Sequence, residues 1–274
     1  MVILLMPLNW GLESRKWQLA TRDLMPLSFG RACMATLAGV AIGSFTFNRM
    51  GEYLGRMLFV DRGKQAQSVS LTLVCSLAQL STTALMGCMG IFLLRQEMQV
   101  IRPDHAALFF SWLRVFAVIS AAACAGLLVG YFRLSYLVSL AKMMHGEKIG
   151  RIVKVLQEVA WTTLFRILFL SFGRYFVFIL QYYLLFAVFG LDLTWEQTWA
   201  AMSVMFLVIA VVPTFTFLTD LGLRWAASVQ IISLFSSNAA GILAVSLGIW
   251  LINLIIPALL GSFLILRTKT FGYK

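Results

Sequence analysis

The strongest constraint on this chain is a series of seven long apolar runs, separated by short segments that carry most of its charged residues. Hydrophobic residues make up 61% of the 274 residues and charged residues 12%, against roughly 45–50% and about 25% in soluble domains. A water-soluble fold could not bury this much apolar surface, whereas a bilayer removes the need to do so. The runs cover residues 28–47, 69–94, 106–132, 161–189, 198–217, 225–235 and 240–266.

These runs predict an all-α, polytopic membrane helical bundle. A helix crosses the hydrocarbon core of a bilayer with about 20 mainly apolar residues, and most of the runs reach that length. A β-barrel would instead show alternating segments of about 10 residues. We expect residues 1–274 to form a single integral membrane domain with about six to seven hydrophobic segments, including two re-entrant segments.

The net charge of +11 comes from basic residues that lie mainly between the apolar runs. Cytoplasmic loops are enriched in Lys and Arg, which places segment 133–154 and the basic tail 267–274 in the cytoplasm. Segments 95–104 and 192–196 then lie outside. Segment 49–64 is cytoplasmic, because one span separates it from segment 95–104. Residues 142–158 combine an apolar face with a basic face, which predicts a helix lying on the cytoplasmic surface. No basic stripe accompanies a soluble fold, so nucleic acid is not an expected partner.

This orientation creates a conflict near the start of the sequence. If residues 28–47 crossed the bilayer completely, Arg15, Lys16 and Arg22 would lie outside, against the charge rule. The conflict disappears if residues 28–56 enter the membrane and return on the same side. Such a path is tolerated where protein or water covers the backbone, so we predict a re-entrant hairpin here.

No metal, cofactor or catalytic motif is expected. The chain has four cysteines, each isolated in an apolar run, and two histidines without a Cys or His partner at metal-ligand spacing: Cys33, Cys75, Cys88, Cys124, His105 and His145. No GxSxG, HExxH, P-loop or Rossmann fingerprint is present. The chain is therefore not expected to be an enzyme.

The most informative motif occurs twice. Both copies begin Phe-Thr-Phe, at Phe45 and at Phe215, and each then places an acid four residues before an arginine. On a helix these acid–arginine pairs share a face. Corresponding polar breaks in two halves of a sequence indicate a midplane binding site in transporter-like folds. The pairs are Glu52 with Arg56 and Asp220 with Arg224.

The breaks themselves are predicted at glycine and proline positions, since these residues interrupt or loosen helices. Two other interpretations compete with a functional role for the repeated motif. The three matching residues can be a chance match, and the acid–arginine pairs can be surface ion pairs that contribute little to stability. The spacing of Gly39 with Gly43 and of Gly51 with Gly55 also permits close helix packing. The predicted structural breaks are Gly51, Gly55, Pro213 and Gly222.

Two arginines, Arg166 and Arg174, lie inside the run 161–189. Charged residues within spans usually face the protein interior or a cavity. Arg166 is expected to extend its side chain to the cytoplasmic interface. For Arg174, that reading stays open beside contact with a phosphate or a carboxylate in a cavity.

The chain resembles the transmembrane region of the lysylphosphatidylglycerol synthases, a flippase-like membrane family that includes stand-alone proteins. The resemblance covers nearly the whole chain, and its most specific parts are the Gly-Glu-x-x-x-Arg element and the closing Pro–Gly segment. Members usually have a hydrophobic helix before the NWGLESRKW stretch, and this sequence is expected to begin within that helix. They often carry Pro before the Gly-Glu element, where this chain has Phe47. The matching stretches are 9–17, 48–56, 171–182, 213–224 and 238–262.

The resemblance implies a flippase-like protein of the bacterial inner membrane that binds or translocates a charged phospholipid between leaflets, with a cytoplasmic C-terminus. The soluble aminoacyl transferase domain of the synthases is absent from this sequence, so lysyl transfer is not expected. A membrane accessory subunit of a glycosyltransferase or envelope enzyme, which binds a lipid-linked substrate, is the alternative. A membrane enzyme acting on lipid is a third reading. The expected partners are a membrane phospholipid or lipid-linked substrate, with a second copy of the chain or an envelope enzyme also open. The candidate headgroup-binding residues are Glu52, Arg56, Arg174, Asp220 and Arg224.

Overall fold

The computed structural model describes residues 1–101, 106–133, 154–214 and 217–270, and the described residues are helical with no strand among them. Short 3-10 helices cover Phe47–Arg49 (η1) and Lys154–Gln157 (η3), and a π-helix covers Leu251–Ile255 (η4). The predicted surface helix 142–158 lies outside the described residues except for its end. The α-helices are α1 (Val2–Ala20), α2 (Phe29–Gly43), α3 (Gly51–Met57), α4 (Gln65–Ile101), α5 (Ala106–Phe132), α7 (Trp161–Val188), α8 (Trp195–Val211), α9 (Phe217–Ile232), α10 (Ala239–Trp250) and α11 (Ile256–Thr270).

Four helical stretches in the described residues are long and apolar enough to cross a membrane, namely 65–99, 114–132, 161–188 and 239–267. The all-α prediction is therefore confirmed, whereas the expected six to seven segments are not all of spanning length. The apolar helices α2 and α8 have only 15 and 17 residues. At 1.5 Å per residue they measure about 22 and about 26 Å, less than a hydrocarbon core of about 30 Å.

Helices α2 and α3 form a tight hairpin whose two ends meet. The ammonium of Lys64, after α3, donates a 2.9 Å hydrogen bond to the carbonyl of Leu24, before α2. The helices approach so closely that a Cβ on Gly55 would lie 2.5 Å from both the Ala38 carbonyl oxygen and the Gly39 Cα. The small-residue spacing noted in the sequence thus serves packing between these two helices.

Helices α8 and α9 form a second hairpin of the same kind. The Asn238 amide, after α9, donates a 3.1 Å hydrogen bond to the carbonyl of Phe189, before α8. Helix α8 begins with a capping box in which Thr194 and Gln197 satisfy one another's backbone amides. Pro213 lies in the non-helical connection between the two helices, where it cannot interrupt a hydrogen-bonded turn.

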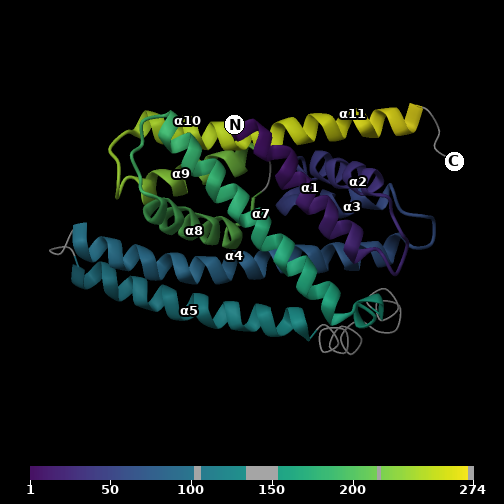
Figure 1. The fold of residues 1–274 in the computed structure, drawn as a ribbon, viewed down its shortest axis with the longest axis horizontal. Helices are drawn as coiled ribbons and strands as arrows, with labels where there is room; N and C mark the ends of the chain where they lie inside the picture. Colours follow the sequence, from purple (N-terminus) through teal and green to yellow (C-terminus); the bar gives the residue numbers. More distant parts are fainter. Residues whose placement is uncertain (102–105, 134–153, 215–216, 271–274) are drawn as a thin grey trace.

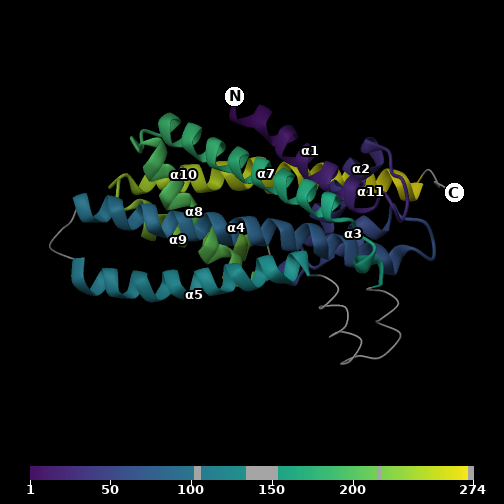
Figure 2. The same cartoon turned by 60° about the horizontal axis from the view of Figure 1, so that its bottom comes forward.

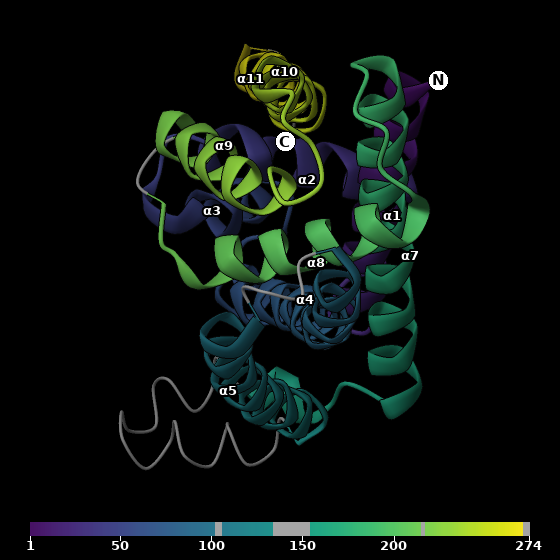
Figure 3. The same ribbon diagram turned by 90° about the vertical axis from the view of Figure 1, so that its left-hand side faces the viewer.

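The two hairpins start from opposite ends of the molecule. In Figure 1 the connections beside α2 and α3 lie at the right, next to the end of α11, while the connections beside α8 and α9 lie at the left. Helix α4 and the α10–α11 helix run along the whole long axis between these ends. Helix α5 lies beside α4 along its length (Figure 2), and in the end view it is the outermost helix, with α4 between it and α8 (Figure 3).

Helix α1 departs from the sequence-based expectation. The charge argument placed Arg15, Lys16 and Arg22 together in a segment outside the apolar runs. Instead α1 is continuous from Val2 to Ala20, and its polar residues are part of it. It packs against α7 and α2, and both of its tryptophans, Trp10 and Trp17, are buried. Of the charged residues of α1, Glu13 and Lys16 lie inside the protein, whereas Arg15 is exposed.

Candidate functional site

The polar face of α1 is the starting point of the site. Asn9, Glu13 and Lys16 follow one another at intervals of four and three residues, so they lie on one side of the helix. All three are buried, with exposed fractions of 0%, 4% and 0%. Charged side chains are almost never buried so completely unless they are paired. Their partners come from α3, α4 and α7.

Three cations converge on the carboxylate of Glu13. Its Oε1 accepts a 2.9 Å hydrogen bond from Nη2 of Arg56, on α3. Its Oε2 lies 2.8 Å from Nη1 of Arg174, on α7, and 2.7 Å from Nζ of Lys16. We call these four residues the Glu13 cluster. One carboxylate faces three basic groups, so with all three protonated the cluster holds two positive charges in excess.

Polar and aromatic neighbours hold the cations in place. The Lys16 ammonium also donates to Oε1 of Gln79 and to Oγ of Ser171, both at 3.2 Å. The Arg174 guanidinium lies 4.9 Å from the ring centroid of Trp10, and its Nε donates to Oδ1 of Asn9 at 2.8 Å. Cation–π contacts of this kind stabilise a charge that has left water.

A chain of amides connects the cluster to α10–α11. Asn9 donates a 3.0 Å hydrogen bond to the side chain of Asn253, which in turn donates to Gln181 at 3.0 Å. Asn253 lies in the π-helix η4, and it is buried. Single π-helical turns inside α-helices occur frequently at functional sites. Here the wide turn coincides with the point where α10–α11 joins the polar network.

The guanidinium of Arg56 has unused hydrogen-bonding capacity. Its Nε and Nη1 atoms are buried and have no hydrogen-bond partner within the described part of the chain. The Arg56 charge lies 5.4 Å from the ring centroid of Trp17, which offers no acceptor. Unsatisfied buried donors are rare and call for an explanation. An anion beside the cluster would supply acceptors for them.

The tips of the two hairpins touch each other. The backbone amide of Asn48 donates a 2.7 Å hydrogen bond to the carbonyl of Thr214. The rings of Phe45 and Phe217 meet edge to face, with centroids 5.7 Å apart. Asn48 and Arg49 have φ angles of 45° and 58°, in the left-handed region that residues with a Cβ seldom adopt. The two sequence motifs therefore meet in space.

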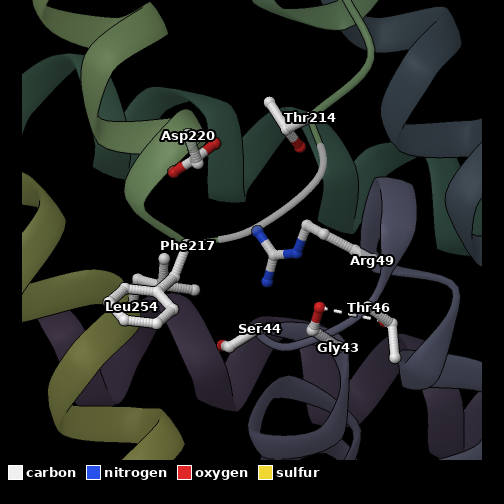
Figure 4. A pocket seen from close by; sticks show the side chains of 8 residues that line it. All are labelled: Gly43, Ser44, Thr46, Arg49, Thr214, Phe217, Asp220 and Leu254. Atoms are coloured by element: carbon white, nitrogen blue, oxygen red, sulfur yellow. Dashed lines mark hydrogen bonds between the residues drawn. The ribbon is translucent and has the colours of Figure 1, made fainter.

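A small pocket, which we call the tip pocket, lies at this junction (Figure 4). Arg49 points into it, between Asp220 and Ser44. Its volume is about 10 Å³, which is room for about one water molecule. The tip pocket is lined by Gly43, Ser44, Thr46, Arg49, Thr214, Phe217, Asp220 and Leu254.

Ion pairs connect the tip pocket to the Glu13 cluster. Asp220 pairs with Arg224 in α9, with 2.8 Å between Oδ2 and Nε. Arg49 lies close enough to Asp220 for their charges to interact, and its Nη2 is 2.7 Å from Oε1 of Glu52. The other oxygen of Glu52 lies 3.8 Å from Nη2 of Arg56. Alternating charges thus extend from the tip pocket into the interior.

Comparisons with known proteins add no identification. No family model, no curated protein and no solved structure matches this chain. The described residues also hold no group of three or more His, Cys, Asp or Glu side chains that could bind a metal ion. The case for function therefore depends on the geometry of the charged residues.

The candidate residues from the sequence fall into two connected groups. Arg56 and Arg174 belong to the Glu13 cluster, while Glu52, Asp220 and Arg224 belong to the ion pairs beside the tip pocket. Glu52 and Arg56 share a face of α3 as expected, but the shorter contact of Arg56 is with Glu13. Arg174 contacts a carboxylate, one of the two readings left open.

Arg166 is exposed. The glycines carry different roles from those expected. Gly222 lies inside α9, in a place where an added Cβ would meet nothing within 4 Å, so the chain has no break there. Gly51 and Gly55 lie within α3 and serve its packing against α2. Sequence reasoning missed Glu13 and Lys16. The signal that could have found them is that both lie between Trp10 and Trp17, at helical spacing after Asn9.

Proposed function

We propose that this chain is an integral membrane protein that binds the anionic headgroup of a phospholipid and moves it between the leaflets. The observation that carries the proposal is the Glu13 cluster, in which Lys16, Arg56 and Arg174 face a single buried carboxylate. Burying uncompensated charge in a low-dielectric interior costs several kcal/mol or more per ion. A phosphate would offset that cost, and arginine binds phosphate in a planar, two-pronged geometry.

The hairpins support the re-entrant arrangement within the proposal. Each hairpin closes on itself at its base, through Lys64 with Leu24 and through Asn238 with Phe189. With the long axis along the bilayer normal, one hairpin enters from each face and the tips meet in between. Irregular backbone at that depth is tolerated where protein covers it, as the contact between Asn48 and Thr214 provides.

The ends of the molecule suit the orientation predicted from charge. The connections that carry Arg22 and Lys64 lie at the same end as the end of α11 (Figure 1). The connection after α3 and the end of α11 are net basic, so this end is proposed to face the cytoplasm of a bacterial cell. The acidic segment 192–196 lies at the opposite end. The C-terminus is then cytoplasmic.

A path for the lipid follows from the surface of the first hairpin. Phe45, Met50, Leu54 and Leu58 are exposed on it, so acyl chains can stay in the bilayer beside α3 while the headgroup enters at the tip pocket. The pocket is too small for a headgroup, since it has room for about one water molecule. Separation of the two tips is therefore part of the proposed cycle, and Arg49 is the first cation that the headgroup meets.

Lipid translocation in proteoliposomes tests the proposal. Fluorescent phosphatidylglycerol is placed in both leaflets, and the rate at which the inner pool becomes accessible to an external quencher is measured. We expect Arg174→Gln to lower the protein-dependent rate by at least about tenfold, as loss of one buried charged contact costs about 1.5–3 kcal/mol. Arg166→Gln is the matched control, because Arg166 lies on the same helix but is exposed.

Two outcomes would count against the proposal. If wild-type protein does not accelerate translocation but still binds the lipid, an accessory subunit that holds a lipid-linked substrate explains the cluster better. If Arg174→Gln and Arg166→Gln both translocate lipid at the wild-type rate, the headgroup does not use the Glu13 cluster. Thermal unfolding of both variants in detergent separates loss of function from loss of fold.

A further inference from the structure

Lys16 differs from the other two cations of the Glu13 cluster in one chemical respect. The guanidinium groups of Arg56 and Arg174 keep their charge at any pH that a protein experiences, whereas a lysine ammonium can release its proton when it is buried. The side chain of Lys16 is fully buried. Among the three cations of the cluster, Lys16 is therefore the one that can change its charge.

The groups that face Lys16 come from three helices, and Arg56 on a fourth helix, α3, shares its carboxylate partner Glu13. Glu13 approaches from its own helix α1, Cys75 and Gln79 from α4, and Ser171 and Arg174 from α7. Arg56 and Arg174 carry the same sign of charge as the ammonium, and they compete with it for the single carboxylate. Cys75 is the other group on this side that could exchange a proton.

The protonated form of Lys16 is fully coordinated in this arrangement. Its three N–H groups are matched by three acceptors, Oε2 of Glu13, Oε1 of Gln79 and Oγ of Ser171. The Ser171 hydroxyl donates its own proton to the carbonyl of Ile167 at 3.0 Å, which leaves its lone pairs free to accept. The site is thus built to hold an ammonium once the surrounding charge permits it.

We infer that binding of an anionic headgroup at the Glu13 cluster is coupled to uptake of one proton by Lys16. This inference rests on the proposed function. With a neutral Lys16 amine and no lipid, the cluster carries one excess positive charge. With the ammonium and one phosphodiester anion, it again carries one excess positive charge. The proton comes from solvent to the lone pair of Nζ and returns when the lipid leaves, so the buried charge stays constant through the cycle.

The coupling supplies an energy source for the proposed transport. Each lipid anion that passes through the cluster is accompanied by a proton, so a pH difference across the membrane favours lipid movement away from the acidic side. Binding must also strengthen as the pH falls, because the bound state holds more protons. A phosphodiester stays ionised across this range, so the lipid itself contributes no titration.

Isothermal titration calorimetry of the full chain in detergent with dihexanoyl phosphatidylglycerol tests the inference. Titrations in two buffers that differ in ionisation enthalpy report the number of protons taken up per lipid bound. For wild type we expect uptake that rises with pH towards about one proton, and an affinity that falls by up to about tenfold per pH unit where uptake is complete.

Three variants isolate Lys16. Lys16→Arg keeps a cation that cannot release its proton, so it should bind the lipid without proton uptake and without the pH dependence. Lys16→Met should bind more weakly and also without uptake, which keeps the test valid if Lys16→Arg does not fold. Cys75→Ala should retain wild-type uptake. Proton uptake by His105 or His145 would be unchanged in all three variants, so it cannot be mistaken for uptake by Lys16.

The outcomes distinguish the two proposals. Lipid binding by wild type without proton uptake, or equal uptake in wild type and a folded Lys16 variant, overturns the role of Lys16 and leaves the proposed function standing. Loss of uptake in Cys75→Ala assigns the proton to Cys75 and also overturns it. Absence of lipid binding by wild type overturns the proposed function, and the coupling with it.

Discussion

The backbone amide of Asn48 donates a 2.7 Å hydrogen bond to the carbonyl of Thr214, and this contact joins the tips of two helical hairpins that start from opposite ends of the molecule. Each tip belongs to one copy of the Phe-Thr-Phe motif. The contact gives the repeated motif a structural meaning, since it brings Arg49 and Asp220 to the same small pocket. Charged residues from both halves of the chain thereby form one connected site.

The tip conformation leads to a first prediction. Asn48 has a φ of 45°, and a left-handed conformation costs a residue with a Cβ about 1–2 kcal/mol. Asn48→Gly should therefore be neutral or stabilising, whereas Asn48→Val should destabilise the protein by about 1–2 kcal/mol. Both variants keep the amide that binds Thr214. Equal unfolding free energies in detergent for the two variants would contradict the strained conformation.

The Glu13 cluster leads to a second prediction. Glu13→Gln leaves three cations without their carboxylate, two of them buried, and breaking a buried ion pair in this way costs about 3–5 kcal/mol. Glu52→Gln is the matched control, because its carboxylate is 21% exposed and its partner Arg49 is 35% exposed, so we expect a loss below about 1 kcal/mol. Chemical unfolding in detergent measures both. A larger loss in Glu52→Gln would show that the cluster is not the main charged centre.

Helix packing leads to a third prediction. A Cβ on Gly55 would lie 2.5 Å from the Ala38 carbonyl oxygen, so Gly55→Ala must push α3 away from α2. Overpacking of this kind costs about 1–3 kcal/mol. Gly222→Ala adds a methyl group in open space inside α9 and should stabilise the protein by about 0.5–1 kcal/mol. The two glycine variants should therefore shift the unfolding midpoint in opposite directions.

Membrane topology gives a fourth prediction. Single cysteines are introduced at Arg22, Arg62 and Asp192, all exposed, in a chain whose four native cysteines have been replaced. A membrane-impermeant thiol reagent should label Arg22→Cys and Arg62→Cys from the same side, because Lys64 contacts Leu24. Asp192→Cys should be labelled from the other side. Labelling of Arg22→Cys and Arg62→Cys from opposite sides would show that the chain between them crosses the bilayer instead of returning to the side from which it entered.

Sequence patterns predicted the parts of this structure that depend on local composition. The long apolar runs predicted the four helical stretches that are long and apolar enough to span a membrane. The Phe-Thr-Phe repeat pointed to residues that prove to be neighbours. Glu13 and Lys16 were missed because residues 1–27 lie outside the apolar runs, and their charged side chains were assigned to one side of the membrane. Their burial depends on cations from α3 and α7, and no local pattern in α1 reveals those partners.

The pairing of Arg56 shows the same limit. The spacing of Glu52 and Arg56 predicted a pair within one helix, but the shorter contact of Arg56, at 2.9 Å, is with Glu13. Arg56 has a long side chain, and the packing of α1 against the first hairpin brings Glu13 within its reach. Gly222 was misread for a related reason. A glycine in an apolar stretch can mark a helix break, or it can lie within a continuous helix. The sequence alone does not distinguish the two cases, because the difference depends on how the neighbouring elements pack.

The most direct test of the central claim is an experimental structure of the protein in nanodiscs that contain phosphatidylglycerol, with and without Arg174→Gln. The proposed function predicts phosphate density within hydrogen-bond distance of the Arg56 guanidinium, where Nε and Nη1 now have no partner among the described residues. The variant should lose that density. A wild-type structure with ordered lipid elsewhere and only protein groups around Arg56 and Arg174 would contradict a headgroup site at the Glu13 cluster.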